Sequence, residues 1–238
     1  MTADYSNHYQ HFAPAGCSEN QQPISVHILE MKSEQDFDSR HLHELEKRVL
    51  ANKKTKNAKM QYLVSRTFVK ALYLSESACW NQYQLKYLPE QHAVCLFAKN
   101  NVVKKLSLSH SKNWIAVLDV PKGTGAIDIQ YHSKSAVSIA TMQKSFAPAD
   151  QQLLQQNQHS FFDLWTIKEA YAKLKNLSIF EVLTIPVNEI EQHCYIEIIP
   201  LHKKISIALA LRPDIHHNKA IFRWTTNKKG EFVLANSP

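Results

Sequence analysis

A chain of 238 residues can bury roughly 70 per cent of its unfolded surface, as one large domain or two small ones. Its formal charge of +7 predicts an anionic partner, such as a nucleic acid, a phosphorylated cofactor or an acidic protein. With only four glycines, neither a Walker loop nor a Gly-x-Gly-x-x-Gly fingerprint can be written. The P-loop, kinase and Rossmann classes are therefore excluded.

The cysteines and the N-terminus indicate the cellular compartment of the protein. The four cysteines form no Cys-x-x-Cys pair, which favours buried reduced thiols over a zinc ribbon or redox site. No apolar run reaches eighteen residues, and the N-terminus lacks the charged start and apolar segment of a secretion signal. We therefore expect a cytoplasmic protein with no membrane partner, and a disordered polar tail over residues 1–22.

Residues 23–120 are predicted to form a first α+β half. Hydrophobic periodicity indicates helices over residues 33–49 and 58–74, and strands over residues 24–29, 93–98, 102–108 and 114–120. Ser109 to Asn113 is interpreted as the turn between the last two strands. Arg66 and Lys70 lie four residues apart on one face of the second helix, where they either decorate the surface or bind a phosphate.

Residues 121–238 are predicted to form a second α+β half, beginning near Pro121. The pattern indicates a strand over residues 127–130, helices over 135–144, 148–156 and 160–176, and strands over 180–187, 194–200, 204–211, 220–226 and 231–235. Each half therefore consists of helices and an antiparallel meander, although no repeat is visible at the level of residues.

The helix predicted over residues 160–176 is the best defined element. Ser160 and Asp163 form a plausible capping pair, and cationic residues lie at the negative end of the helix dipole. At 3.6 residues per turn, one stripe of the helix is apolar and is predicted to face the core. The residues of this stripe are Leu164, Ile167, Tyr171 and Leu174.

The opposite side of the same helix carries an acid and a cation beside large aromatic rings. Glu169 and Lys173 lie there, with Phe162 and Trp165 next to them. One interpretation is an exposed ion pair, which stabilises a helix by about 0.2 to 0.5 kcal/mol. The other is a cleft in which a carboxylate is held for chemistry.

A glycine-containing segment precedes two oxygen ligands on a short strand. Because alternate residues of a strand share a face, Asp128 and Gln130 point together, away from Ile127 and Ile129. A carboxylate and an amide carbonyl suit a hard cation such as Mg²⁺ that is shared with a phosphate.

Four short blocks follow one another in the chain: 65–67 with Lys54 upstream, 109–111 followed by Trp114, 125–130, and 165–170 followed by Lys173. The last block reads Trp-Thr-Ile-Lys-Glu-Ala. In combination the blocks resemble the Sfp-type 4'-phosphopantetheinyl transferases over most of residues 25–212. The resemblance implies two pseudo-symmetric α+β halves in one monomeric chain, with coenzyme A bound between them.

The resemblance also implies the activity and the site. The family transfers the phosphopantetheine arm of coenzyme A to a serine of an acyl or peptidyl carrier protein, and releases adenosine 3',5'-bisphosphate. By motif, Asp128 and Glu169 would hold Mg²⁺ with Gln130 beside them. Catalysis would rest on Glu169, Lys173 and Asp128, with Glu169 as the base. The coenzyme's phosphates would be contacted by Lys54, Arg66, His110, Lys168 and Lys173.

Two other functions remain open on the sequence alone. Many family members carry an acid where Gln130 stands and a glycine where Ala126 stands, so a silent binding module for coenzyme A or a carrier protein is one alternative. The other is a nucleic-acid-binding protein, which the core positions of the aromatic residues and the lack of a recognisable motif argue against. The pathway of the carrier and the tolerance for acyl-coenzyme A are not predicted.

Overall fold

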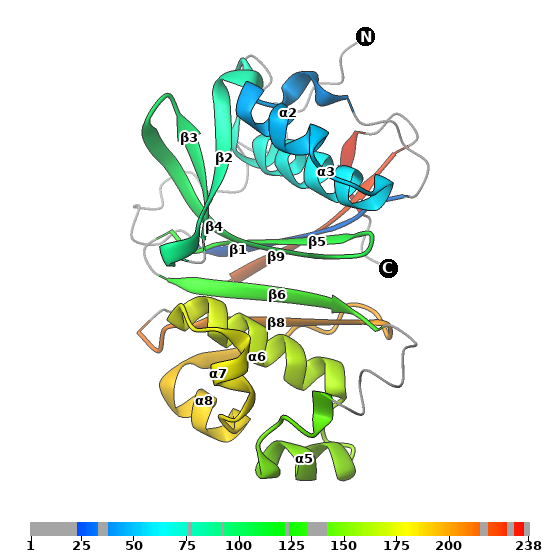
Figure 1. The fold of residues 1–238 in the computed structure, drawn as a ribbon, viewed down its shortest axis with the longest axis vertical. Coiled ribbons are helices and arrows are strands. Elements are labelled where there is room, and N and C mark those ends of the chain that lie inside the picture. Colours follow the sequence, from blue (N-terminus) through cyan, green and yellow to red (C-terminus); the bar gives the residue numbers. More distant parts are fainter. Residues whose placement is uncertain are drawn as a thin grey trace.

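The computed structural model describes residues 23–32, 38–75, 78–91, 93–121, 124–132, 142–214, 219–227 and 231–235. The tail predicted over residues 1–22 lies outside these residues, as do residues 135–141 of the helix predicted over residues 135–144. The described residues have an α+β fold, as expected, built in four layers (Figure 1).

The upper two layers are a helical layer and a large mixed sheet. The sheet has seven strands in the order β10-β9-β1-β5-β4-β3-β2. Helices α2 (Glu44–Ala51) and α3 (Lys56–Tyr73) cover one face of it (Figure 1). The strands are β1 (Ile24–Glu30), β2 (Tyr83–Leu88), β3 (Ala93–Ala98), β4 (Asn101–Ser111), β5 (Trp114–Asp119), β9 (Lys219–Thr226) and β10 (Phe232–Leu234).

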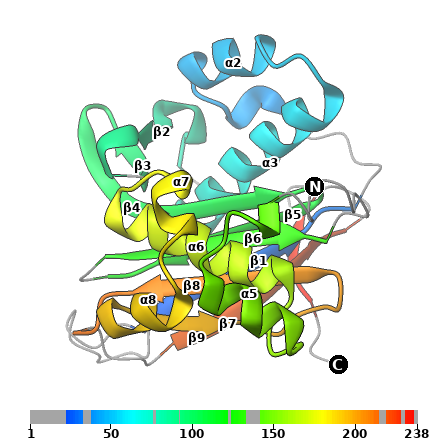
Figure 2. The same cartoon turned by 60° about the horizontal axis from the view of Figure 1, so that its bottom comes forward.

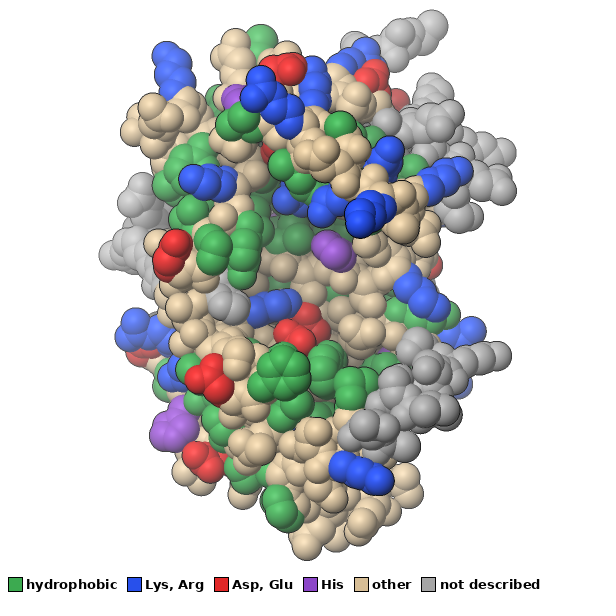
Figure 3. Space-filling model, viewed as in Figure 1, with side chains coloured by type: hydrophobic (Ala, Val, Ile, Leu, Met, Phe, Trp, Pro, Cys, Tyr) green, Lys and Arg blue, Asp and Glu red, His purple; other side chains and the backbone are tan. Residues whose placement is uncertain are grey.

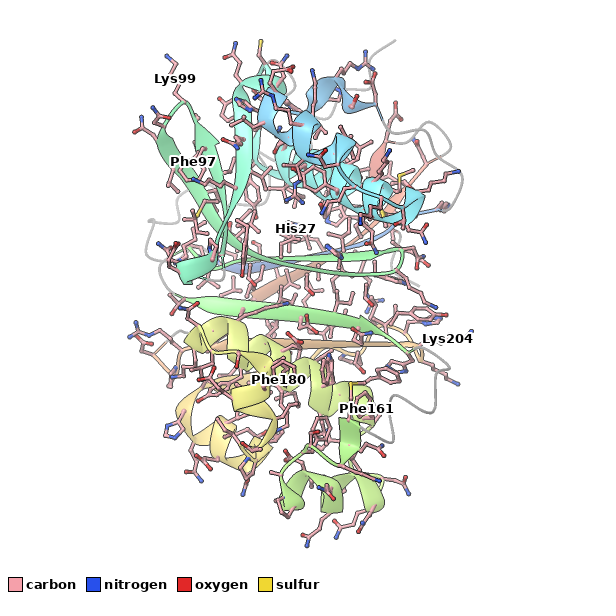
Figure 4. All side chains as sticks on the ribbon, in the orientation of Figure 1. His27, Phe97, Lys99, Phe161, Phe180 and Lys204 are labelled. Carbon is pink, nitrogen blue, oxygen red and sulfur yellow. The ribbon has the colours of Figure 1, made fainter. Side chains whose placement is uncertain are left out.

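Aromatic rings pack in the core between these two layers. Phe68 and Val64 of α3 are fully buried against the sheet. His27 of β1 lies in this core, 6% exposed, with its ring stacked 4.9 Å from that of Phe222 (Figure 4). Short 3-10 turns connect the elements at Ser39–His41, Trp80–Gln82 and Pro89–Gln91.

The lower two layers are a small sheet and a second group of helices. The sheet has the order β6-β8-β7 and packs its apolar face on the large sheet. Its strands are β6 (Gly125–Tyr131), β7 (Tyr195–Ile198) and β8 (Ile205–Leu211). The helices gather on its outer face (Figure 2). They are α5 (Pro148–Gln155), α6 (Phe161–Lys175), α7 (Ile179–Leu183) and α8 (Val187–His193).

A row of serines joins β4 of the large sheet to the free edge of β6. Ser107 and Ser111 accept hydrogen bonds from the backbone N–H groups of Ile127 (3.1 Å) and Tyr131 (2.9 Å). These N–H groups face away from β8, so the serines satisfy donors that the small sheet leaves unpaired. Because alternate residues of a strand share a face, Ser109 lies in the same row.

Most predicted elements are confirmed, with four differences. The helix predicted over residues 33–49 is α-helical only from Glu44, after a 3-10 turn at Ser39–His41, and residues 33–37 lie outside the described residues. The strand predicted over residues 180–187 is wrong, because Ser178 and Glu181 form a capping box that begins α7, and Pro186 precedes α8. Strand β2 was not predicted. Ser109 to Asn113 is not all turn, since β4 continues to Ser111.

The division of the chain near residue 121 stays a prediction. Strand β9 follows that point in the sequence but pairs in parallel with β1, and β10 pairs with β9. The C-terminal segment therefore completes the sheet that the first half begins, and the small sheet is left with three strands.

The interpretation of Lys70 as an exposed cation is wrong. Its side chain is 0% exposed, and its Nζ lies 2.6 Å from Glu46 Oε2 on α2. Glu46 also accepts the backbone N–H groups of Leu85 (2.8 Å) and His43 (2.8 Å). This buried pair therefore joins α2, α3 and β2.

Replacing Lys70 by methionine is expected to destabilise the fold by about 3–5 kcal/mol, because Glu46 would remain buried without its cation. Urea unfolding followed by circular dichroism measures this. Lys47→Met is the control, since it removes an exposed pair with Glu44 and should cost no more than about 1 kcal/mol. Equal effects of the two substitutions would contradict the account.

Candidate functional site

Helix α6 begins and ends where the sequence predicts. The Ser160 hydroxyl accepts the N–H of Asp163 (3.1 Å) while the Asp163 carboxylate accepts the N–H of Ser160 (3.0 Å), a complete capping box. Asn176 ends the helix in the left-handed conformation. Leu164, Ile167 and Tyr171 are buried as predicted, which turns Glu169 and Lys173 toward β6.

Asp128 of β6 is held from two sides. It is 6% exposed, and its Oδ1 accepts one hydrogen bond from the Ser109 hydroxyl and one from Lys173 Nζ, both 2.7 Å long. Lys173 also donates to the backbone carbonyl of Ile127 (3.2 Å). The cation of α6 therefore pairs with the acid of β6, and the simple exposed pair of Glu169 and Lys173 is not what the structure shows.

Glu169 is a half-buried carboxylate close to a second one. Burial raises the pKa of Glu169, the negative charge of Asp128 raises it further, and Lys173 opposes both effects. Two carboxylates and one ammonium leave this part of the site with a net negative charge. A bound cation would be stabilised by this charge, whereas without a cation the two carboxylates repel each other.

The oxygen donors of the site fit Mg²⁺ when water and phosphate supply the remaining ligands. The described residues contain no cluster of three or more His, Cys, Asp or Glu side chains that could enclose a metal ion. The carboxylates of Asp128 and Glu169 and the amide carbonyl of Gln130 are present instead. Gln130 donates through Nε2 to the Tyr131 carbonyl (3.2 Å), which leaves its Oε1 for a ligand. Mg²⁺ commonly takes one or two carboxylates and shares its other positions with water and phosphate, so these residues fit it.

A group of cations lies across from the acids. Partial loss of hydration lowers the pKa of His110, whose side chain is still exposed, and the positive charges of Arg66, Lys173 and Lys53 lower it further. The three cations therefore lie close enough to His110 for their charges to act on it. Figure 3 shows a hollow on this face with Lys and Arg side chains above it, a histidine within it and acidic side chains at its lower edge.

Arg66 is oriented by an aromatic ring. Its guanidinium lies 3.8 Å from the ring centre of Tyr62, and Nη1 donates to the Ser65 hydroxyl (3.0 Å). Its Nε is buried and has no partner among the described residues, so a donor remains for an anion. Lys53 lies over the same ring, 5.4 Å from its centre. The structure thus places Lys53 beside Arg66. Lys54 is exposed, and its contact with a phosphate of the coenzyme stays a prediction.

Lys168 does not belong to this site. It is 0% exposed, its Nζ lies 2.7 Å from Asp150 Oδ2, and it donates to the backbone carbonyls of Val182 (3.3 Å) and Ile185. The ammonium group is therefore paired with a buried acid and bonded to two carbonyls, away from solvent. The predicted contact of Lys168 with phosphate is therefore contradicted, and Lys168 instead ties α6 to α5 and to the segment around α7.

Lys168→Met is expected to destabilise the fold by about 3–5 kcal/mol, because Asp150 would be left buried and unpaired. The affinity of the folded fraction for coenzyme A, the ligand that the resemblance implies, should equal that of the wild type. Unfolding in urea and calorimetric titration measure the two quantities, with exposed Lys175→Met as the control. Normal stability together with weakened binding would restore the phosphate role.

The aromatic frame beside the acids is largely internal packing. The ring of Phe162 stacks on that of His132 at 4.4 Å, with an angle of 7° between them. His132 Nε2 lies 2.9 Å from the Ser206 hydroxyl, and Ser206 donates to Asp163. These contacts fasten the first turn of α6 to β6 and β8, at the end of the site beyond Gln130.

Sequence reasoning missed two contributors to the site. Ser109 was interpreted as part of a turn, although it donates to Asp128. Lys53 was passed over in favour of its neighbour Lys54. The same reasoning also missed Asp150, the buried partner that holds Lys168 away from the site. Only Ser109 had a usable signal, because it alternates with Ser107 and Ser111 along a strand.

An acid pair with an adjacent lysine faces a group of cations, so the site suits a phosphorylated ligand that carries a bound cation. Residues 126–229 match the family model of the 4'-phosphopantetheinyl transferase superfamily, which covers just under half of the chain. This segment of the chain is therefore similar to that superfamily. The matched segment includes Asp128, Gln130, Glu169 and Lys173.

No curated protein matches the chain. Within the described residues, none of the helices is both long and apolar enough to span a bilayer.

Proposed function

We propose that this protein transfers the 4'-phosphopantetheine arm of coenzyme A to a serine of an acyl or peptidyl carrier protein. The products are the holo-carrier protein and adenosine 3',5'-bisphosphate. The observation that carries the proposal is the contact of Lys173 with Asp128, next to Glu169, inside the segment that matches the superfamily. The more specific Sfp-type assignment rests on the four sequence blocks.

Asp128 and Glu169, with the carbonyl oxygen of Gln130, would hold Mg²⁺. The ion would neutralise charge on the pyrophosphate of coenzyme A. Ser109 and Lys173 fix the orientation of Asp128, so this ligand is ordered before any substrate arrives. Arg66 and His110 would face the phosphate groups of the nucleotide, with Lys53 beside them.

The chemical step needs one proton acceptor and one group that stabilises charge. The carrier serine Oγ forms a bond to the phosphorus next to the pantetheine arm. The bond from that phosphorus to the bridging oxygen breaks, and its electron pair leaves with the bisphosphate. Glu169 accepts the serine proton, for which burial and Asp128 raise its pKa in the helpful direction. Lys173 stabilises the negative charge that develops on the phosphate oxygens.

The partners follow from the same proposal. A basic chain with a formal charge of +7 suits an acidic carrier protein, since complementary charge speeds association. We propose a cytoplasmic, pseudo-dimeric monomer. A weakly active binding module is the second candidate, and it is favoured by Gln130, which supplies an amide where an acid would bind Mg²⁺ more strongly.

Glu169→Gln is expected to lower the release of adenosine 3',5'-bisphosphate by about 10²–10³-fold, the loss typical of removing one catalytic electrostatic contact. Chromatography of the reaction mixture measures it. The metal-free variant should unfold at the same temperature as the wild type or a higher one, because a carboxylate whose ionised form is disfavoured has been removed.

The matched control is Glu191→Gln, which changes an exposed glutamate on α8 and should leave the rate unchanged. A Glu169→Gln variant that releases the bisphosphate at the wild-type rate would contradict the assignment of Glu169.

A further inference from the structure

The first turn of α2 is capped by a histidine. His43 is the residue before the helix, and its ring Nδ1 accepts the backbone N–H of Leu45 (3.1 Å). The usual capping residues are Ser, Thr, Asp and Asn, whose oxygens accept this hydrogen bond throughout the neutral and mildly acidic range. An imidazole nitrogen accepts it only while that nitrogen carries no proton. The cap of α2 therefore exists only when His43 is neutral.

A protonated His43 would also be a cation at the positive end of the helix dipole, which is unfavourable. The acids that face His43 belong to the first turn of α2. They are Glu44 and Glu46, and the Glu46 carboxylate accepts the His43 N–H (2.8 Å). Lys47 lies 2.7 Å from Glu44, and Lys70 of α3 lies 2.6 Å from Glu46. Both negative charges are thus already paired, so they offset only part of the cost of protonating His43.

A second histidine lies two residues earlier, in the 3-10 turn that precedes the helix. The ring of His41 packs against that of Trp80, with 5.0 Å between the ring centres, and its carbonyl accepts Lys70 Nζ (3.0 Å). Partial burial lowers the pKa of His41, and the charges of Arg40 and Lys70 lower it further, against the opposing charge of Asp38. The folded structure therefore disfavours a proton on His41 as well.

The other end of α2 leads to the cations of the candidate site. The backbone N–H of Lys53 donates to the carbonyl of Leu50 in the last turn (3.1 Å), and its ammonium group lies over the ring of Tyr62 on α3. Helix α2 has eight residues and lies on the outer side of the molecule (Figure 1). A helix of this length does not persist in water on its own, so it depends on its cap and its packing.

We propose that His41 and His43 form an acid-sensitive latch that holds the start of α2 in place only while both rings are neutral. The inference does not depend on the proposed function. The opened segment binds protons more readily, because His41 there regains an ordinary pKa near 6.5 and His43 there has no cap to lose. The stability of α2 is therefore complete above this pH and falls as the pH drops below it. When the latch opens, Lys53 is no longer held over Tyr62.

Hydrogen–deuterium exchange of the α2 amides, corrected for the intrinsic exchange rate, measures the opening. Between about pH 7.5 and about pH 5.5, one such histidine raises the opening constant by about tenfold and two raise it by up to about a hundredfold. His43→Asn keeps a strong cap that does not titrate, so its rise should be limited to about tenfold. The amides of β1 report instead on the buried His27, whose pKa is lowered to about 3, and they should respond alike in both proteins.

The control is His193→Asn, which removes an exposed histidine from the last turn of α8 and should leave the response of α2 unchanged. Circular dichroism at neutral pH checks that each variant is folded. Equal protection of the wild-type α2 at both pH values would overturn the inference. So would a His43→Asn variant that responds as strongly as the wild type, or one in which the substitution changes α2 and β1 to the same extent.

Discussion

The carboxylate of Asp128 is where the large sheet, the small sheet and α6 meet. Ser109 reaches it from β4 and Lys173 reaches it from α6, while Asp128 itself belongs to β6. The serines on either side of Ser109 hold β6 by its backbone, so the strand cannot shift without losing several hydrogen bonds at once. The site is therefore ordered by the same contacts that join the two sheets.

Around Asp128, the acidic and the cationic side chains lie on different elements. The two carboxylates lie on β6 and α6, the cations Arg66 and Lys53 lie on or next to α3, and Lys173 stands between. This distribution suits a ligand with a doubly charged centre and a phosphorylated end. The fully buried Lys70 and Lys168 do not contribute to this distribution, because they form ion pairs with Glu46 and Asp150.

Local signals in the sequence predicted α6 well, since its capping box and apolar stripe depend on residues three or four apart. Alternation along β6 likewise placed Asp128 and Gln130 on one face. Lys70 could not be judged in this way, because its partner lies 24 residues away and only tertiary packing buries the pair. Residues 180–187 were misread because an apolar run of that length is equally compatible with a buried strand and short helices.

The central claim is that this site moves a phosphopantetheine group onto a protein. The most direct measurement is the intact mass of an apo carrier protein after incubation with this protein, coenzyme A and Mg²⁺, alongside a reaction in chelator. The account predicts that the carrier gains the mass of one phosphopantetheine group, and only when metal is present. The account would be contradicted if carriers from several unrelated pathways all kept their original mass while the protein still bound coenzyme A.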